Sequence, residues 1–355
     1  MSNYAKYLNF NLLLIFVPLA IVGEFLHWPP LLVFAISALA VMPLASLIGQ
    51  ATEELAAHTG PRLGGFLNAT LGNTAELIIT IFAIRAGLLE LVKASITGSI
   101  LGNVLLVLGL SILLGGLKNG IQRFDRSHAG INSTMLILAV VGLGIPSLFS
   151  HAIEVKNHEA VEYLSLGVAL VLIIIYGLSL LYAFFSAPGR KEAAEEAHIH
   201  RGWDTPKASG VLVAATLLIA WLSEILVGAV EPVIEAVGVT EFFLGIIIIP
   251  LVGNVAEHLV GVQMAVRNRM ELSLAISVGS SLQIALFVAP ALVFISLLMG
   301  NPLTLVFNQF ELISLVAAVL IAALVSLDGE SNWLEGAQLL VVYIIIGLAF
   351  FYLPT

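Results

Sequence analysis

This chain contains no cysteine, and only 10% of its 355 residues are charged. The missing cysteine excludes disulfide bonds and thiol chemistry. Acidic residues outnumber basic ones, 23 Asp and Glu against 14 Lys and Arg, and no basic stripe is present, so nucleic acid is excluded as a partner. No phosphate-binding loop or nucleophile elbow appears, so we expect no enzyme activity and no resident cofactor.

What the chain has in excess is apolar sequence. Hydrophobic residues occupy 59% of the positions, and the mean hydropathy is +1.06. Crossing a hydrocarbon core of about 30 Å takes about 20 apolar helical residues, and such runs recur along the chain. The predicted spans are 8–27, 30–50, 65–87, 94–117, 130–150, 162–186, 209–230, 241–266, 272–299, 309–327 and 333–352. The sequence therefore predicts an all-α polytopic membrane protein with eleven transmembrane helices, embedded in the lipid bilayer.

The distribution of Lys and Arg predicts the orientation of these helices. Eleven of the 14 basic residues fall in the N-terminal segment and in alternate loops, and three fall on the other side. Because cytoplasmic loops carry the excess of Lys and Arg, we expect a cytoplasmic N-terminus and a C-terminus outside. The energy source expected for such a chain is an ion gradient, since no ATPase signature is present.

The sequence repeats itself at an offset of 181 residues. Residues 72–108 align without a gap with residues 253–289, and twelve of the 37 columns are identical. Shared hydrophobicity matches Leu and Val by accident, but it does not match GNTAE with GNVAE and a Gly-Ser pair at fixed spacing. We therefore interpret the two segments as copies of one unit.

The first copy begins in the third predicted span and the second copy in the eighth, a step of five crossings, which is an odd number, so the second copy is expected upside down relative to the first. Inverted repeats are typical of secondary transporters, which bind their substrate near the bilayer midplane where the repeats meet. The predicted parts are an extra N-terminal transmembrane helix (1–27), a first five-helix repeat (28–186), a polar acidic linker (187–208) and a second, inverted five-helix repeat (209–355). His198 and His200 of the linker could bind a metal, but charged loops often contain such a histidine pair without a function.

Each copy places one glutamate, Glu76 or Glu257, inside an apolar run. A charged side chain at the bilayer centre costs about 2.5–3.5 kcal/mol on insertion scales, so it normally faces the protein interior and has a task there. Asn73 precedes Glu76 by three residues and Asn254 precedes Glu257 by three, which puts amide and carboxylate on one helix face. These residues are the predicted centre of a binding site.

The helices that follow add more oxygen ligands. Ser99 and Asn103 are four residues apart in the first copy, and Ser280 and Gln283 are three apart in the second. Carboxylate, amide and hydroxyl oxygens suit a hard cation that takes six to eight ligands, namely Ca²⁺. His258 is the single imidazole nearby, and one imidazole without cysteine thiolates does not make a zinc site.

These small polar groups also have a structural interpretation, which the sequence leaves open. Asn73 and Ser99 could hydrogen-bond backbone across closely packed membrane helices, and the glycines of the repeats could serve helix packing alone. His258 could be an ordinary interior histidine.

Two buried carboxylates about 5 Å apart repel each other by about 3 kcal/mol at an effective dielectric constant of about 20. An empty site with both groups ionised is therefore disfavoured. One divalent cation or two protons can neutralise it, but the two cannot occupy the same oxygens. This exclusion predicts exchange of Ca²⁺ for H⁺, with both ions as transported substrates.

Other acidic residues are weaker candidates. Glu53 and Glu54 are expected at the cytoplasmic mouth of the second span, where they could guide cations inward or form an ordinary solvated helix end. Five further acids lie near predicted span ends or polar openings and are treated as accessory: Glu24, Glu224, Glu231, Glu235 and Glu311.

With these residues assembled, the sequence resembles the calcium/cation antiporter superfamily, and specifically its calcium/proton exchanger branch. The resemblance rests on ATEELAAHTGPRLGGFLNATLGNTAELIITIFAIRAG and GSILGNVLLVLG in the first half, and on PLVGNVAEHLVGVQMA and GSSLQIALFVAP in the second. With the eleven-span layout it extends over nearly the whole chain. The Gly-Asn-x-x-Glu-His form of the second repeat and Gln283 resemble the proton-coupled branch more than the sodium-coupled one.

The resemblance implies that Glu76 and Glu257 are the central cation- and proton-binding carboxylates. It implies that the other polar residues of the repeats line or support the site: Asn73, Ser99, Asn103, Asn254, His258, Ser280 and Gln283. Gly102 departs from the pattern, since many relatives are expected to have a small polar residue there. The compact chain resembles forms from a prokaryotic plasma membrane, and the sequence leaves its oligomeric state open, a homo-oligomer included.

Two other functions stay open at this point. A sodium-coupled calcium exchanger would keep the fold and change the coupling ion. A passive cation channel would need no alternating access. The two inverted copies argue against a channel, because such repeats are typical of transporters that alternate between two open states.

Overall fold

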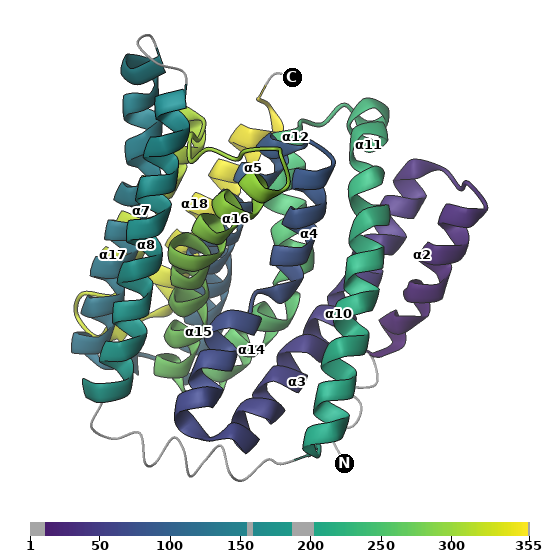
Figure 1. Ribbon diagram of the computed structural model, residues 1–355. Helices are drawn as coiled ribbons and strands as arrows, with labels where there is room; N and C mark the ends of the chain where they lie inside the picture. Colours follow the sequence, from purple (N-terminus) through teal and green to yellow (C-terminus); the bar gives the residue numbers. More distant parts are fainter. Residues whose placement is uncertain (1–10, 155–158, 187–201, 354–355) are drawn as a thin grey trace. The chain divides into compact units, whose positions relative to one another are not determined.

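The structure, a computed structural model, describes residues 11–154, 159–186 and 202–353. These residues are almost entirely helical (Figure 1). Most of the predicted linker, 187–201 with His198 and His200, lies outside the described residues.

The helical elements of the first half begin with a 3₁₀ turn, η1, and include one π-helical segment, η2. They are η1 (Leu12–Ile15), α2 (Phe16–Phe25), α3 (Pro30–Leu71), α4 (Thr74–Arg85), α5 (Leu89–Leu101), η2 (Gly102–Val107), α6 (Leu108–Asn119), α7 (Arg126–Glu154) and α8 (Glu159–Ser186).

The second half contains two further π-helical segments, η3 and η4. Its helices are α10 (Thr205–Gly228), α11 (Val230–Val237), α12 (Glu241–Phe243), η3 (Leu244–Ile248), α13 (Ile249–Gly253), α14 (Val255–Val266), α15 (Met270–Gln283), η4 (Ile284–Val288), α16 (Ala289–Leu298), α17 (Gln309–Val325) and α18 (Trp333–Phe351). Strands β1 (Gln122–Arg123) and β2 (Glu330–Ser331) form one short antiparallel pair.

Seven helices in the described ranges are long and apolar enough to cross a membrane. An eighth span results if the pair 241–253 and 255–266, bent by 66°, counts as one. The helices Leu12–Phe25 and Gln309–Val325 are apolar but shorter. The prediction of an all-helical polytopic membrane protein is confirmed at this level, whereas the count of eleven stays a prediction.

One predicted boundary is wrong. We expected a loop between spans 30–50 and 65–87, but α3 continues without interruption from Pro30 to Leu71. Its 42 residues do not form one straight rod, because a Cβ on Gly64 would lie 2.5 Å from the Ala56 carbonyl oxygen, whereas residues eight apart in a straight helix are about 12 Å apart along its axis. Ala, Leu and Glu of the segment ATEELAAH are strong helix formers, so the backbone stays helical where the sequence becomes polar.

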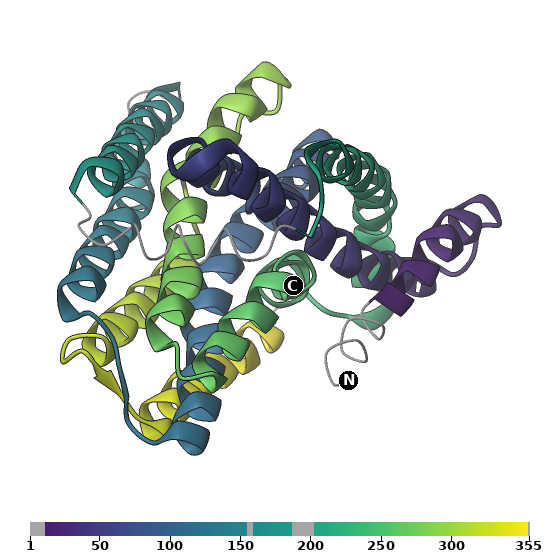
Figure 2. The same ribbon diagram turned by 90° about the horizontal axis from the view of Figure 1, so that it is seen from below.

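The helices group into two compact units, each assembled from separate stretches of the chain. Unit 1 comprises residues 1–82, 174–236 and 252–256, and unit 2 comprises 83–173, 237–251 and 257–355. These units are defined by which segments touch, whereas the repeats are defined by similarity of sequence. The units therefore do not test the predicted repeats 28–186 and 209–355, which stay a prediction. In unit 1, α10 runs along α3, and α2 contacts both (Figures 1 and 2).

Helix α5 is the most enclosed helix of unit 2. Every residue from Leu91 to Leu101 is buried, so α5 has no polar face toward water or lipid. It packs against η3 and the first turns of α17, while α6 packs against α18 and α7 against α17. The strand pair ties the loop after α6 to the loop before α18, with Gln122 opposite Ser331.

Most element boundaries of the two copies of the repeated segment agree at the offset of 181 residues, and the start of the π-helical segment differs by one residue. Helices α4 and α14 begin at Thr74 and Val255 and end at Arg85 and Val266. Helices α5 and α15 begin at Leu89 and Met270, and the π-helical segments end at Val107 and Val288.

The turn between the two helices of each copy also agrees. Gly87 and Asn268, which align at the same offset, both have positive φ, of 80° and 62°. Glycine adopts this backbone conformation freely, and Asn is among the few other residues that tolerate it. The two segments are thus alike in local structure, while the inversion of one against the other stays a prediction.

Glycines allow α5 and η3 to touch backbone to backbone in unit 2. A Cβ on Gly98 would lie 2.5 Å from Ile246 Cα, and a Cβ on Gly245 would lie 2.5 Å from Ala94 Cβ. Glu241, at the start of α12, accepts a hydrogen bond from the Leu91 N–H at 2.8 Å and so caps the first turn of α5. This crossing holds α5 in place over two turns.

We expect Gly98→Ala to destabilise the folded protein by about 1–3 kcal/mol, because the added methyl group collides with the Ile246 backbone, which cannot rotate away. Gly167→Ala in α8 is the matched control, since a Cβ there meets no described atom within 4 Å. Thermal unfolding of the purified protein in detergent measures both. Equal melting temperatures for the two variants would contradict the backbone contact.

Candidate functional site

A break in the helix precedes each of the two repeated glutamates. Helix α3 ends at Leu71 and α4 begins at Thr74, so Gly72 and Asn73 form the break in the first copy. In the second copy α13 ends at Gly253 and α14 begins at Val255, so Asn254 lies at the bend. Irregular backbone at membrane depth is tolerated only where protein or a water-filled cavity covers it, which makes these breaks informative.

Glu76 and Glu257 both lie in the first turn of the helix that follows the break. The N-terminus of a helix carries partial positive charge and unpaired N–H groups, which favour a negatively charged side chain. The Gly-Asn-x-x-Glu pattern therefore puts a carboxylate where the local backbone stabilises its charge.

In unit 1 the structure brings together residues from both copies of the repeat. Asn254 Nδ2 donates a hydrogen bond to Glu76 Oε1, across 178 positions of the sequence. Glu76 is 3% exposed and Asn254 is also 3% exposed, so the contact is fully enclosed. Asn73 is buried as well. A carboxylate with an amide at hand, shielded from solvent, is an arrangement that can hold a cation or a proton.

Gly253 makes room for this contact. A Cβ at position 253 would lie 2.8 Å from Glu76 Cγ, so any other residue would push the glutamate side chain away. The sequence showed Gly253 as part of the repeat but did not distinguish this role from helix packing. The distinction depends on which side chain crosses the glycine, and that is decided by tertiary packing.

The candidate oxygen ligands of α5 and α15 belong to unit 2. Ser99, Asn103 and Ser280 are buried, and Gln283 is half-buried. Asn103 is the second residue of η2, and Gln283 directly precedes η4. Single π-helical turns often occur at functional sites. Asn103 Nδ2, an amide donor that cannot bind a cation, is buried without a hydrogen-bond partner among the described residues, which suits a group that donates to water.

Glu257 and His258 are half-buried and also belong to unit 2, whereas Glu76 belongs to unit 1. The predicted meeting of the two carboxylates, and the assembly of one site from all nine residues, therefore stay predictions. In the described part of the chain no three His, Cys, Asp or Glu side chains gather as a resident metal centre would require.

Glu53 and Glu54 lie inside the continuous helix α3 instead of at a helix end. Glu53 is exposed and Glu54 is half-buried. Glu54 Oε1 accepts a hydrogen bond from the Gly202 N–H at 3.2 Å, so the chain just before α10 is held against α3 within unit 1. Their predicted role in guiding cations is not tested by this contact.

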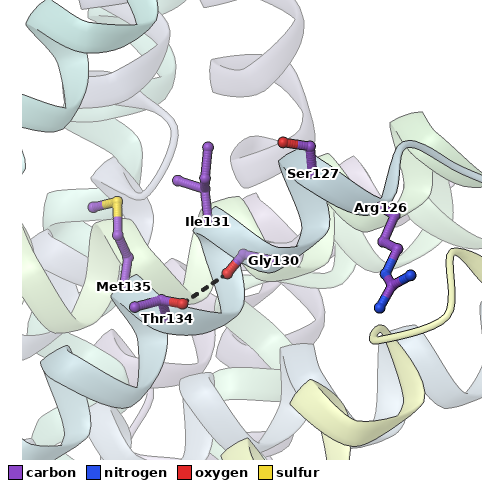
Figure 3. Close-up of a pocket in the computed structure, with 6 residues that line it drawn as sticks. All are labelled: Arg126, Ser127, Gly130, Ile131, Thr134 and Met135. Atoms are coloured by element: carbon purple, nitrogen blue, oxygen red, sulfur yellow. Dashed lines mark hydrogen bonds between the residues drawn. The ribbon is translucent and has the colours of Figure 1, made fainter.

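The surface hollow drawn in Figure 3 contains none of the predicted residues. It has a volume of about 710 Å³ and lies along the first turns of α7. Six residues of that helix line it: Arg126, Ser127, Gly130, Ile131, Thr134 and Met135. The Thr134 hydroxyl donates to the Gly130 carbonyl at 2.9 Å, so it is satisfied within its own helix.

We expect Asn254→Asp to destabilise the protein by about 1–3 kcal/mol in Ca²⁺-free buffer, because it replaces the donor opposite Glu76 with a second carboxylate. The two groups repel when both are ionised, so the loss is largest at alkaline pH and shrinks as protonation neutralises one of them. Melting temperatures of variant and wild type across a pH series measure this effect. A pH-independent difference would contradict the contact.

Comparison with known proteins identifies the family of the chain. The chain matches the family described as sodium/calcium exchanger protein over residues 29–185 and 207–352. It is 44% identical to a Ca²⁺/H⁺ antiporter of Aphanothece halophytica, over 97% of this chain and 96% of that one. It is 43% identical to the Ca²⁺/H⁺ antiporter ChaA of Bacillus subtilis, over 95% and 97% of the two chains.

A solved structure, that of native YfkE, shares the fold. Its TM-score is 0.84 at 41% sequence identity, covering 97% of this chain and all of that one. The resemblance inferred from the two repeat signatures is therefore confirmed. The chain is an integral membrane protein that belongs to the sodium/calcium exchanger protein family, and within it to the group of these Ca²⁺/H⁺ antiporters.

Proposed function

We propose that the protein is a secondary active transporter that exchanges cytoplasmic Ca²⁺ for H⁺. The observation that carries the proposal is the pair of glutamates, Glu76 and Glu257, each in the first turn of a helix that follows a Gly-Asn break at the same offset. Relatives 43–44% identical over nearly the whole chain and named Ca²⁺/H⁺ antiporters support the choice of ions.

The proposed cation site combines both copies of the repeat. Glu76 and Glu257 supply the charge, and the amide and hydroxyl oxygens of Asn73, Asn254, Ser99, Asn103, Ser280 and Gln283 supply neutral ligands. The contact between Glu76 and Asn254 supports this assembly, because it already joins the two copies through side chains. His258 borders the site, and Glu53 and Glu54 guide cations from the cytoplasmic side.

Exchange follows from charge neutrality in a low-dielectric interior. Two ionised carboxylates without a counter-charge are unfavourable, so the site holds either one Ca²⁺ or protons when it crosses between the two sides. A cation and a proton cannot occupy the same carboxylate oxygen. Movement of one ion is thereby tied to the opposite movement of the other.

The proposed architecture is an extra N-terminal helix followed by two inverted five-helix repeats, with eleven crossings in all. The crossings that length alone does not identify are the short helices Leu12–Phe25 and Gln309–Val325, the bent pair 241–253 and 255–266, and the segment around the break at Gly72 and Asn73. The N-terminus lies in the cytoplasm, the C-terminus lies outside, and the membrane is the plasma membrane of a prokaryote. The two bacterial relatives named above support that location.

Calcium uptake into proteoliposomes under an imposed pH gradient tests the function. With an acidic lumen and an alkaline, sodium-free bath, we expect wild-type protein to accumulate Ca²⁺ as protons leave, and a protonophore to abolish the uptake. An absolute requirement for Na⁺ would replace the proposal with a sodium-coupled exchanger. Passive equilibration without counterflow would indicate a channel.

Substitution of the two glutamates tests the site. We expect Glu76→Gln and Glu257→Gln each to reduce proton-driven uptake to the rate of protein-free vesicles, because a neutral amide neither titrates nor supplies the charge that Ca²⁺ requires. Glu159→Gln is the matched control, since Glu159 is an exposed glutamate in the first turn of α8 and is not among the candidate acids. Undiminished transport by either site variant would remove that residue from the proposal.

A further inference from the structure

Glu311 is the most deeply buried carboxylate in the described part of the chain, with an exposed fraction of 0%. It lies in the first turn of α17, where it closes a capping box with Asn308. Its Oε2 accepts a hydrogen bond from the Asn308 N–H at 2.8 Å. Nothing in the proposed exchange uses this residue, although a buried charge in a membrane protein normally has a task.

A second capping box lies at the start of α18. Comparing the two boxes shows which contacts of Glu311 go beyond capping its own helix. There Glu335 Oε2 accepts from the Asn332 N–H at 3.0 Å. Glu335 is half-buried, and among the described residues it has no hydrogen-bond partner on another helix. A cap alone therefore needs neither full burial nor a second helix.

Glu311 differs from Glu335 in the use of its other oxygen. Its Oε1 accepts a hydrogen bond from the Thr97 hydroxyl of α5, at 3.2 Å. Thr97 is 0% exposed, so the bond is shielded from water. Hydrogen bonds to charged groups contribute more than those between neutral groups, particularly where water cannot compete.

The charged groups that face Glu311 lie on the same side of α5 as Thr97. Lys93, one turn earlier, is almost buried, forms an ion pair with Glu90 and donates to the Val306 carbonyl at 3.0 Å. Lys93 interacts electrostatically with Glu311 as well as with Glu90, so the carboxylate is stabilised by this lysine together with its two hydrogen-bond donors.

The chain that leads into α17 is held just as firmly. Leu303, Leu305 and Phe307 are buried, and serine hydroxyls accept hydrogen bonds from their N–H groups at 2.8–3.1 Å. These serines belong to three other helices of unit 2: Ser296 of α16, Ser165 of α8 and Ser147 of α7. The start of α17 is thus a fixed point against which α5 is anchored.

We propose that Glu311 is a positioning residue, which through Thr97 fixes the part of α5 that carries Ser99 and Asn103. Ser99 follows Thr97 by two residues and Asn103 by six, at the point where the helix widens into η2. The inference rests on the proposed function, because it assumes that these two side chains bind the cation. Loss of the anchor lets α5 shift and weakens cation binding without removing a ligand.

Thr97→Val tests this most directly, since it removes the hydroxyl and keeps the size of the side chain. We expect it to raise the Ca²⁺ concentration for half-maximal uptake about five- to tenfold, as for the loss of one buried hydrogen bond to a charged group. Thr97→Ser restores the hydroxyl and is expected to behave like wild type. The maximal uptake rate at saturating Ca²⁺ should change less than the affinity.

The matched pair Glu311→Leu and Glu335→Leu separates positioning from capping. Both lose the same cap and should lower the melting temperature, but only Glu311→Leu should weaken Ca²⁺ affinity, by about tenfold. The double variant Thr97→Val, Glu311→Leu should be no weaker than Glu311→Leu alone, because both single changes break one bond. If Glu311→Leu does not fold, Thr97→Val decides the matter.

Unchanged affinity in Thr97→Val overturns the inference, and so does an equal loss of affinity in Glu335→Leu. Equilibrium titration of the purified variants with Ca²⁺ provides a second readout that does not depend on the coupling ion. A shifted Ca²⁺ affinity in a protein that shows no proton-driven uptake would support the positioning role and refute the proposed exchange.

Discussion

A carboxylate inside a membrane protein must be neutralised or surrounded by groups that stabilise its charge, and the structure around Glu76 is organised by this requirement. Glu76 is 3% exposed, begins a helix after a backbone break, and receives the amide of Asn254. The helix N-terminus and the amide lower the cost of burial without cancelling the charge. In the proposed exchange, the charge that remains on Glu76 is what a cation or a proton neutralises.

The irregular backbone of this protein is concentrated around the candidate residues. The helix breaks at Gly72 and Asn254 precede the two glutamates, and the π-helical segments η2 and η4 begin beside Asn103 and Gln283. In an uninterrupted helix the backbone carbonyls accept hydrogen bonds from the helix's own N–H groups. A break or a π turn leaves some carbonyls without such a partner, so they can accept from or bind another group. In a bilayer such departures persist only where protein encloses them, so they mark where ligands are needed.

Two buried glutamates, Glu76 and Glu311, meet the same requirement in different ways. Glu311 uses one oxygen for the cap of its own helix and the other for Thr97, and so ties α17 to α5. Glu76 accepts from an amide on a segment that belongs to the other copy of the repeat. In the first arrangement the carboxylate links two helices of unit 2, and in the second it links the two copies of the repeat within unit 1. Burial alone does not distinguish a structural acid from one that binds substrate.

The sequence by itself determined the class of protein, the repeat and its register. Hydropathy predicted a helical membrane protein, and the offset of 181 residues predicted equivalent elements whose boundaries agree down to the positive φ of Gly87 and Asn268. These features depend on local composition and on backbone preferences, which each copy carries with it. The extent of α3 was misjudged for the same reason, since polar residues end a hydrophobic run without ending a helix.

Only the tertiary structure decided which polar groups meet. Asn254 reaches Glu76 across 178 positions, and Thr97 reaches Glu311 across 214. The N-x-x-E pattern at Asn308 predicts a helix cap, yet the identical pattern at Asn332 makes no hydrogen bond to a second helix within the described ranges. Side-chain partners far apart in sequence depend on how helices cross, and that follows from packing over whole surfaces instead of from any local pattern.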